Sequence, residues 1–460
     1  MSLFNFWKKQ NKKEIEEEKE LGQEEFVEEQ EEKGDKNKGI TLSIPDGTEE
    51  ISDRQFYNMK SVVNIKLPDS VKKIGKDAFK GCVNLESINI PNSLEEIGDR
   101  AFYDCRMLEE VIFPDTVKTL GKELFRLCEW LETVHLPEHI TEIPDKIFDY
   151  CRSLENINIP ASVKRIGESA FSECETLHRL IFPKGLQEIG AYAFDKCEGL
   201  EEISCDGNIL SLGAYAFKNC ENLKSIAGDA VIDSISTGAF ERCISLENLT
   251  LGKNITDIPS RCFFSCCNLK ELNLSEKLEN IGDNGLFGCM LLEGDYSFPN
   301  LIEAKKNSFM GCKKINRVVF SDKLEKINVD AFASMKNSVQ LIIPNKKAVI
   351  DFIYSINKEK DYKFCYVYEN TVNKHNIIRI DTEENFNESQ KRMQFSFNNP
   401  KTVVYSISEE YFEEEILDIL ENKFDDSQTR VYITELRNSL VNKDGKENIK
   451  SKFALNFDEI

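Results

Sequence analysis

Histidine, clustered glycine and long apolar runs are all scarce in this chain of 460 residues, and each scarcity argues against a class of function. None of the four histidines pairs with a serine or cysteine at a spacing that nucleophilic enzymes use; they stand apart at His135, His139, His178 and His375. The glycines come singly rather than in loops that cradle phosphate. The sequence therefore predicts a protein that is not an enzyme, with no catalytic residue, no cofactor and no metal site.

The chain also lacks an apolar stretch long enough to suggest a membrane-spanning helix. The lysines near the start precede no apolar core of signal-peptide length. We therefore expect a cytoplasmic protein without stable membrane insertion, although export by an unrecognised route stays open. The oligomeric state cannot be deduced from these features.

Acidic residues outnumber basic ones, 81 to 59, which gives a formal net charge of −22. A charge of this sign and size argues against binding to nucleic acid or to an anionic membrane surface. It favours a protein partner that is basic or weakly charged.

A constant 23-residue step organises most of the chain. One phenylalanine or leucine recurs at this step without insertion or deletion, at Phe56, Phe79, Phe102, Phe125, Phe148, Phe171, Phe194, Phe217, Phe240, Phe263, Leu286, Phe309 and Phe332. A period of this length indicates a solenoid, in which each unit buries its apolar face against its neighbours.

Each unit contains a predicted strand, a turn and a tight second turn. In Leu85-x-x-Ile88-x-Ile90 the alternate apolar residues predict a short half-buried strand, and Pro91 ends it. A glycine further on is suited to a left-handed turn, and the Ala78-Phe79-x-x-Cys82 spacing predicts a helical or 3₁₀ turn. The glycine recurs at Gly75, Gly98, Gly121, Gly167, Gly190, Gly213 and Gly282.

Eleven of the fifteen cysteines stand three residues after the phenylalanine position: Cys82, Cys105, Cys128, Cys151, Cys174, Cys197, Cys220, Cys243, Cys266, Cys289 and Cys312. A cysteine that occurs once per repeat behaves as a small buried hydrophobic residue. Cys262, Cys266 and Cys267 cluster locally, but no histidine lies near them to complete a metal site. Stacked free thiols favour a reducing compartment.

The repeat resembles the BspA-like (Treponema pallidum type) leucine-rich repeat, whose units read L-x-x-I-x-I-P-x-S-V-x-x-I-G-x-x-A-F-x-x-C. The segments 85–91 and 162–174 match this pattern almost letter for letter. The resemblance covers residues 40–344 and implies an α/β repeat fold, a leucine-rich repeat solenoid of about thirteen units with a parallel β-sheet on its concave face. It also implies the adhesive or protein-binding role that surface and secreted members commonly have.

Composition divides the chain into five parts. We expect a charged, disordered tail at 1–38, the solenoid at 39–344, a cap at 345–368, a loosely ordered polar linker at 369–400 and a small α/β appendage at 401–460. The cap is predicted as a helix over 348–356 and a strand over 363–368. The appendage is predicted as a strand over 402–407, a helix over 408–423 and a strand over 430–434. Within the solenoid the pattern weakens after residue 200, where Gly294-Asp295-Tyr296 breaks the strand motif.

The solvent side of the predicted strands is the candidate site. Four successive units carry glutamate at the same position, and such like charges on neighbouring strands repel one another. We expect a basic partner to bind this concave face at Glu86, Ser87, Asn89, Glu109, Glu110, Ile112, Glu132, Thr133, His135, Glu155, Asn156, His178, Ile181 and Glu201. A solvated face whose glutamate is simply the repeat consensus is the alternative, and a ladder of divalent cations is a weaker one.

The main functional prediction is thus a non-enzymatic protein-binding scaffold. Two alternatives stay open. The first places an activity in the C-terminal appendage, which the repeats would only target. The second is adhesion at a cell surface.

Overall fold

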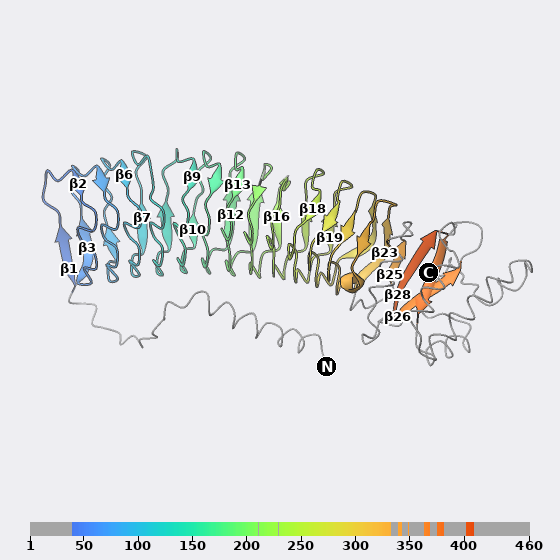
Figure 1. Ribbon diagram of the computed structural model, residues 1–460. Coiled ribbons are helices and arrows are strands. Elements are labelled where there is room, and N and C mark those ends of the chain that lie inside the picture. The colour runs from blue at the N-terminus through green and yellow to red at the C-terminus, as the bar shows by residue number, and fades with distance from the viewer. Residues whose placement is uncertain are drawn as a thin grey trace, which may run out of the picture. The chain divides into compact units, whose positions relative to one another are not determined.

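A computed structural model describes residues 39–209, 211–228, 230–332, 339–342, 348, 363–368, 375–380 and 402–408. The chain divides into two units, Met1–Gly39 and Ile40–Ile460, and the described residues from Ile40 onward belong to the second. In that unit the chain winds into a coil of stacked turns, each as long as one sequence repeat over most of the array (Figure 1).

One side of the coil carries the predicted strands, which pair in parallel with an offset of one repeat over most of the array. We call this side face A. Its strands are β1 (Ile40–Ser43), β3 (Val62–Lys66), β5 (Ser87–Ile88), β7 (Glu110–Ile112), β8 (Thr133–His135), β10 (Asn156–Ile157), β12 (Arg179–Phe182), β14 (Glu202–Cys205), β16 (Ser225–Ala227), β17 (Asn248–Thr250), β19 (Glu271–Asn273), β21 (Glu293–Phe298), β23 (Lys314–Phe320) and β25 (Val339–Ile342).

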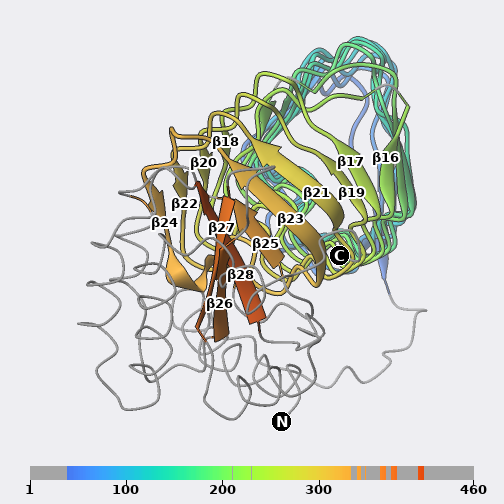
Figure 2. The ribbon, with the colours of Figure 1, turned by 90° about the vertical axis from the view of Figure 1, so that its right-hand side faces the viewer.

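A second line of parallel strands, two residues each, forms on another side of the coil, which we call face B (Figure 2). The sequence analysis missed it. Its strands are β2 (Glu50–Ile51), β4 (Lys73–Ile74), β6 (Glu96–Ile97), β9 (Glu142–Ile143), β11 (Arg165–Ile166), β13 (Glu188–Ile189), β15 (Ser211–Leu212), β18 (Asp257–Ile258), β20 (Asn280–Ile281), β22 (Glu303–Ala304) and β24 (Lys326–Ile327). In each of them the second residue, usually isoleucine, is buried in the core.

Stacked phenylalanines fill the interior of the coil. Neighbouring rings lie nearly parallel, for example with centroids 5.2 Å apart at Phe171 and Phe194 and 5.4 Å apart at Phe217 and Phe240. The rings of Phe79 through Phe263 in this column are fully buried. Offset stacking of this kind adds about 0.5–1.5 kcal/mol per pair to the burial of the ring itself. Leu286 interrupts the column, which resumes at Phe309 and Phe332 with centroids 4.8 Å apart.

The turn expected after the glycine forms with 3₁₀-type hydrogen bonds, Cys82 N to Phe79 O at 3.1 Å and Leu85 N to Cys82 O at 2.9 Å, but it is not a helix. Between these bonds the backbone forms a hydrogen-bonded ladder with the next turn of the coil. Alternate amides donate to the next turn: Asp77 N to Asp99 O at 2.9 Å, and Phe79 N to Ala101 O at 2.8 Å. This alternation is made by two residues per turn with positive φ, of which Asp77 (54°) and Asp104 (60°) are examples. A side chain in this region costs about 1 kcal/mol or more, and the ladder offsets that cost. Among the described residues a 3₁₀ helix forms at η1 (Val329–Phe332).

The recurring glycines were expected to adopt left-handed backbone, and this prediction is wrong. Gly98 and Gly121 have no positive φ. They are needed because successive turns approach one another too closely for a side chain. A Cβ at Gly98 would lie 2.6 Å from Lys76 N, and one at Gly121 would lie 2.4 Å from the carbonyl oxygen of Gly98.

The turn after a face A strand can form without the proline that usually starts it. The carbonyl of Pro91 accepts from Leu94 N at 3.0 Å, and that of Ser275 accepts from Leu278 N at 3.1 Å in the same way. After residue 200 the turns at Gly252 and Ser321 also keep this bond, whereas Ile209 N donates to Val231 O and not to Asp206 O.

The segment expected to break the strand motif lies inside a long strand. Relative to the repeat, the chain has one extra residue between Leu292 and Tyr296. The pairing of β21 with β23 shifts register there, since Gly294 lies opposite Ile315 and Asp295 opposite Arg317. Gly294 has a φ of +109° with open space around it, which allows this bulge. The stretch between Phe298 and Leu301 is one residue shorter than its counterpart between Ile90 and Leu94, so the 23-residue step is restored within the same turn.

At its end the face A sheet continues into the C-terminal part of the chain. The order is β21-β23-β25-β28-β26-β27, with β26 (Lys363–Tyr368) and β28 (Thr402–Ser408) close to the predicted strands. Strand β27 (His375–Ile380) stands in the stretch predicted as a loosely ordered linker. The predicted helices and the strand over 430–434 lie outside the described residues, apart from Ala348 and Ser408, and Ser408 ends strand β28. The proposed division into cap, linker and appendage stays a prediction, as does the disordered tail at 1–38.

Candidate functional site on face A

The predicted site residues lie at the surface of face A, on strands β5 to β14 or just before them. Most are exposed, including His135, Asn156 and Glu201, while Glu86 and Thr133 are half-buried. Backbone pairing sets them in columns: Glu110 lies beside Thr133, Thr133 beside Asn156, and Ile112 beside His135.

Four glutamates form one such column, which we call the acidic column: Glu86, Glu109, Glu132 and Glu155. Their backbones are joined directly, since Glu132 N donates to Glu109 O at 2.9 Å and Glu155 N to Glu132 O at 3.0 Å. Among the residues that the structure describes, none forms an ion pair or a side-chain hydrogen bond with these four carboxylates. Four like charges therefore stand one strand apart, at a cost of a few tenths of a kcal/mol for each neighbouring pair.

In later turns, glutamates at this repeat position have cationic partners. Lys224 binds Glu201 at 2.9 Å and Lys270 binds Glu247 at 2.8 Å. A hydrogen bond and the positive charge of Lys224 lower the pKa of Glu201 below its usual value. The acidic column itself ends at His178, whose Nδ1 donates to the carbonyl of Gly199 at 3.0 Å.

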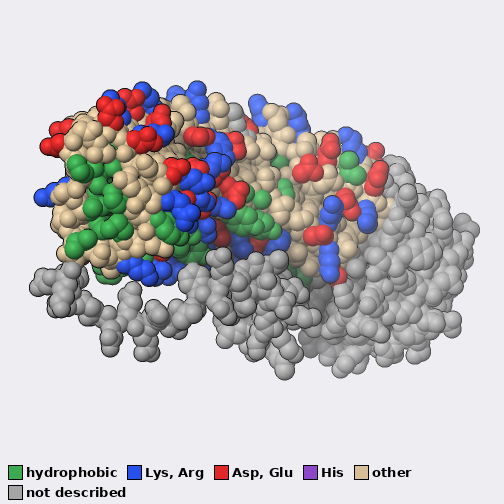
Figure 3. Space-filling view, turned by 60° about the vertical axis from the view of Figure 1, so that its left-hand side comes forward, with side chains coloured by type: hydrophobic (Ala, Val, Ile, Leu, Met, Phe, Trp, Pro, Cys, Tyr) green, Lys and Arg blue, Asp and Glu red, His purple; other side chains and the backbone are tan. Residues whose placement is uncertain are grey.

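On face B, glutamates of the middle turns share a cationic partner, which distinguishes them from the acidic column. Arg165 alone contacts three carboxylates: Asp145 at 3.0 Å, and Glu142 and Glu188 at 3.6 Å each. Across the side of the array shown in Figure 3, acidic and basic side chains lie next to one another. Exposed pairs of this kind contribute little to stability, but each reduces the net local charge.

Large apolar side chains border the acidic column. Ile112 and Ile181, both predicted as exposed apolar points, are 55% and 71% exposed. Trp130, two residues before Glu132, is 52% exposed, and sequence reasoning did not select it. The sequence does contain a signal for it, because the repeat position of Trp130 holds asparagine in other turns. The side-chain amides of Asn84 and Asn222 each donate to a carbonyl 24 residues earlier, and a tryptophan there replaces this bond by an indole ring.

Besides Glu201 and His178, two more of the predicted recognition residues are engaged within the fold. The side-chain amide of Asn89 accepts from Leu67 N and donates to Leu67 O, both at 2.8 Å. The hydroxyl of Ser87 donates to Asn64 Oδ1 at 2.6 Å. Asn89 therefore holds the neighbouring turn in register, which limits what it can offer a partner.

A row of buried carboxylates lies in the turn that follows the glycine. Asp149 is 5% exposed, and Arg126 Nε is 2.8 Å from its Oδ2. Burial raises the pKa of Asp149 to about 6, although Arg126 acts in the opposite direction. Glu241 is similarly buried and is held by two nitrogens of Arg261 at 2.8 Å each. These pairs bridge successive turns, so we assign them a structural role.

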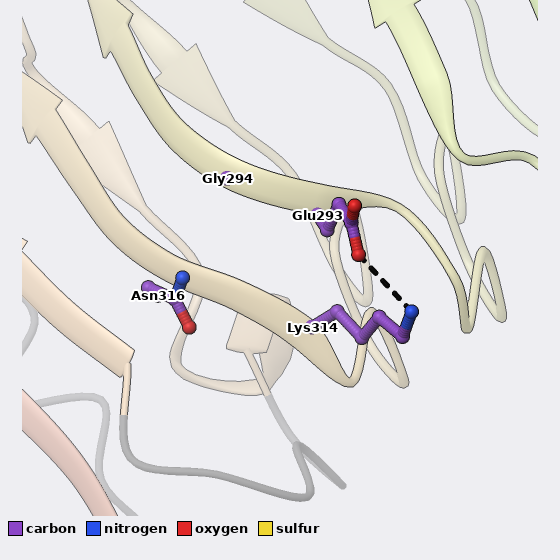
Figure 4. A pocket seen from close by; sticks show the side chains of 4 residues that line it. All are labelled: Glu293, Gly294, Lys314 and Asn316. Carbon is purple, nitrogen blue, oxygen red and sulfur yellow. Dashed lines mark hydrogen bonds and ion pairs between the residues drawn. The ribbon is translucent and has the colours of Figure 1, made fainter.

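A shallow hollow lies beside the bulge of β21, lined by Glu293, Gly294, Lys314 and Asn316. The side chains of Glu293 and Lys314 meet between the two strands, 3.0 Å apart (Figure 4). The two charges that line the hollow thus neutralise each other.

In the described part of the chain no group of three or more histidine, cysteine, aspartate or glutamate side chains is arranged to hold a metal ion. In that part no helix is long and apolar enough to cross a membrane.

Fold and surface together define a parallel β-solenoid of leucine-rich turns with one unbridged column of glutamates on face A. The chain belongs to the family with the BspA type leucine-rich repeat region, whose model matches residues 36–155, 141–266, 233–358 and 305–435.

A leucine-rich repeat protein from Bacteroides ovatus is 27% identical, with 69% of this chain and 90% of that chain covered and a TM-score of 0.57. A leucine-rich cell surface protein from Faecalibacterium prausnitzii is also 27% identical, over 61% and 79%, with a TM-score of 0.39. The leucine-rich repeat protein of T. pallidum is 31% identical, over 40% and 78%, with a TM-score of 0.30. A comparison with curated proteins finds no match.

Proposed function

We propose that this protein is a non-enzymatic scaffold that binds a basic segment of a protein partner on face A, at the acidic column. The observation that carries the proposal is the contrast in pairing. Glu142 and Glu188 on face B, and Glu201 and Glu247 on face A, are bridged by cations, whereas Glu86, Glu109, Glu132 and Glu155 have no such bridge among the described residues. A cationic partner would relieve their mutual repulsion.

The apolar border gives this surface the composition of an interface. Interface cores are enriched in aromatic residues, and the charged groups usually lie around them. Trp130, in the turn before β8, and Ile112, at the end of β7, are both exposed. Leucine-rich repeat folds commonly bind proteins, which agrees with this assignment.

The test replaces the four carboxylates of the acidic column by amides, as Glu86→Gln, Glu109→Gln, Glu132→Gln and Glu155→Gln. The natural partner is then captured from the cell on the full chain and on the variant, at low and high salt. The proposal expects proteins that bind the unaltered chain, leave it as salt rises, and fail to bind the variant.

A matched control makes the same change at Glu50, Glu96, Glu142 and Glu188, which occupy the equivalent position on face B. Binding should persist in this control. If both variants retain the same partners, the site is not on the acidic column.

The cellular location is a separate proposal. Membership of the BspA-type family favours a cell surface or exported location, the alternative to the cytoplasmic location expected from sequence. Protease treatment of intact cells decides between them. A surface protein is degraded while a cytoplasmic marker survives, and a cytoplasmic protein stays intact with that marker.

A further inference from the structure

Two isoleucines on face A stand in the same column of the coil, three turns apart. Ile112 ends β7, where it pairs with His135, and two further repeats lead to Ile181 on β12. They are the two most exposed of the large apolar side chains that the structure describes. Three steps of about 4.8 Å place them about 14 Å apart.

The spacing is preserved across an interruption in the sheet. Strands β10 and β12 belong to separate sheets, so the hydrogen-bonded ladder of face A stops between them. The core continues without a gap, because Phe148 and Phe171 of the same two turns stack with centroids 5.3 Å apart. The two isoleucines are therefore fixed relative to one another by the interior of the coil.

An extended chain matches this distance. Residues i and i+4 of a strand lie on one side of the pleat, about 14 Å apart. A helix fits less well, since the positions that share one of its faces, i+7 and i+11, lie about 10 and 16 Å along its axis. The spacing selects an extended segment that crosses the strands.

Charge completes the description of the occupant. Glu132 and Glu155 of the acidic column belong to the two turns between the isoleucines, about 10 Å away along the strand direction. A long cationic side chain at the middle of the segment can turn toward these two carboxylates. Building on the function proposed above, we infer that face A takes an extended peptide segment of the form apolar–x–basic–x–apolar, with aliphatic ends and arginine or lysine at the centre.

The test is selection from a library of random peptides displayed on phage, using the full chain as bait. Selected peptides are then measured on the double variant Ile112→Ser/Ile181→Ser and on the acidic-column variant. We expect enrichment of two aliphatic residues four apart with arginine or lysine midway. Each isoleucine substitution should weaken binding about tenfold, which is about 1.4 kcal/mol, because the peptide loses an apolar contact of this size.

The outcomes separate the two proposals. Peptides that need the acidic column but bind the isoleucine variant equally well overturn the spacing and leave the proposed function standing. Enriched apolar residues at helical spacing overturn the extended form. Failure to select any peptide, or binding that depends on neither set of residues, contradicts both. A control variant, Thr250→Ser/Asn273→Ser, alters the same column in later turns and should bind as the unaltered chain does.

Discussion

The thiol of Cys197 donates a hydrogen bond to the carbonyl of Phe171, 26 residues earlier, with a sulfur–oxygen distance of 3.0 Å. All eleven cysteines of the column make this bond, from Cys82 to Phe56 at 3.2 Å through Cys312 to Leu286 at 3.1 Å. The sequence analysis treated them as small apolar residues, and they are indeed buried. The structure adds that each thiol links its turn to the backbone of the preceding one.

The stacked thiols should be chemically silent in the folded protein. Burial raises the pKa of Cys197 well above its usual value, and the reactive form of cysteine is the thiolate. With Ellman's reagent at pH 8 we expect the eleven thiols of the cysteine column to react only as fast as the protein unfolds. Cys267, the half-buried cysteine among those described, should react sooner, and Cys267→Ser should remove one thiol from the fast phase. Rapid reaction of all fifteen cysteines in the native protein would contradict the burial of the cysteine column.

Gly98→Ala should be strongly destabilising. The added methyl group would overlap the backbone of Lys76 in the turn beneath, with no flexible side chain to move aside. Overpacking of this kind costs about 1–3 kcal/mol or more, which urea unfolding would register as a lower midpoint. Gly185→Ala is the matched control, because nothing lies within 4 Å of its Cβ position and its φ is not positive. Equal midpoints for the two variants would show that the turns are not packed as described.

Phe148→Ala should cost about 3–5 kcal/mol, because it opens a cavity between two stacked rings. The rings of Phe125 and Phe148 have centroids 5.8 Å apart, and Phe148 is fully buried. Phe148→Leu should cost much less, since Leu286 occupies this position in its own turn and is fully buried. Thermal or urea unfolding measures both. Similar losses for the two variants would argue against a continuous aromatic stack.

Mild acid should stabilise the folded protein through Asp149. Its folded pKa of about 6 lies above the unfolded value, so the folded state disfavours the carboxylate and stability rises as pH falls through 6. Between pH 7.5 and pH 5 the free energy of unfolding should gain about 1 kcal/mol from this group. Asp149→Asn should remove that gain, whereas Asp46→Asn, at an exposed position, should retain it. Unfolding in urea at the two pH values provides the comparison.

The 23-residue period made the coil, its parallel strands and the exposure of Ile112 predictable, because each depends on which residues recur in register. The second line of strands was missed because Lys73–Ile74 is only two residues long and forms through pairing with the neighbouring turns. The left-handed positions were missed because Asp77, Leu127 and Tyr192 share no chemical character. The backbone conformation there is imposed by hydrogen bonds to the next turn.

At the candidate site the glutamates were predictable as a column, whereas their pairing was not. Whether Glu201 is neutralised depends on how far the side chain of Lys224 reaches, and Asn89 becomes structural only because Leu67 lies beside it. Such contacts depend on side-chain geometry between turns, which one-dimensional spacing does not contain.

The bulge at Gly294 shows how strictly the coil regulates the length of its chain. Relative to the repeat, one residue is added between Leu292 and Tyr296 and one is lost before Leu301, so that Phe309 and Phe332 still stack. Each turn of the coil therefore keeps a fixed number of residues. Single insertions survive only when a deletion in the same turn cancels them. New binding surfaces in such a protein must arise by substitution in place, or by the gain and loss of entire turns.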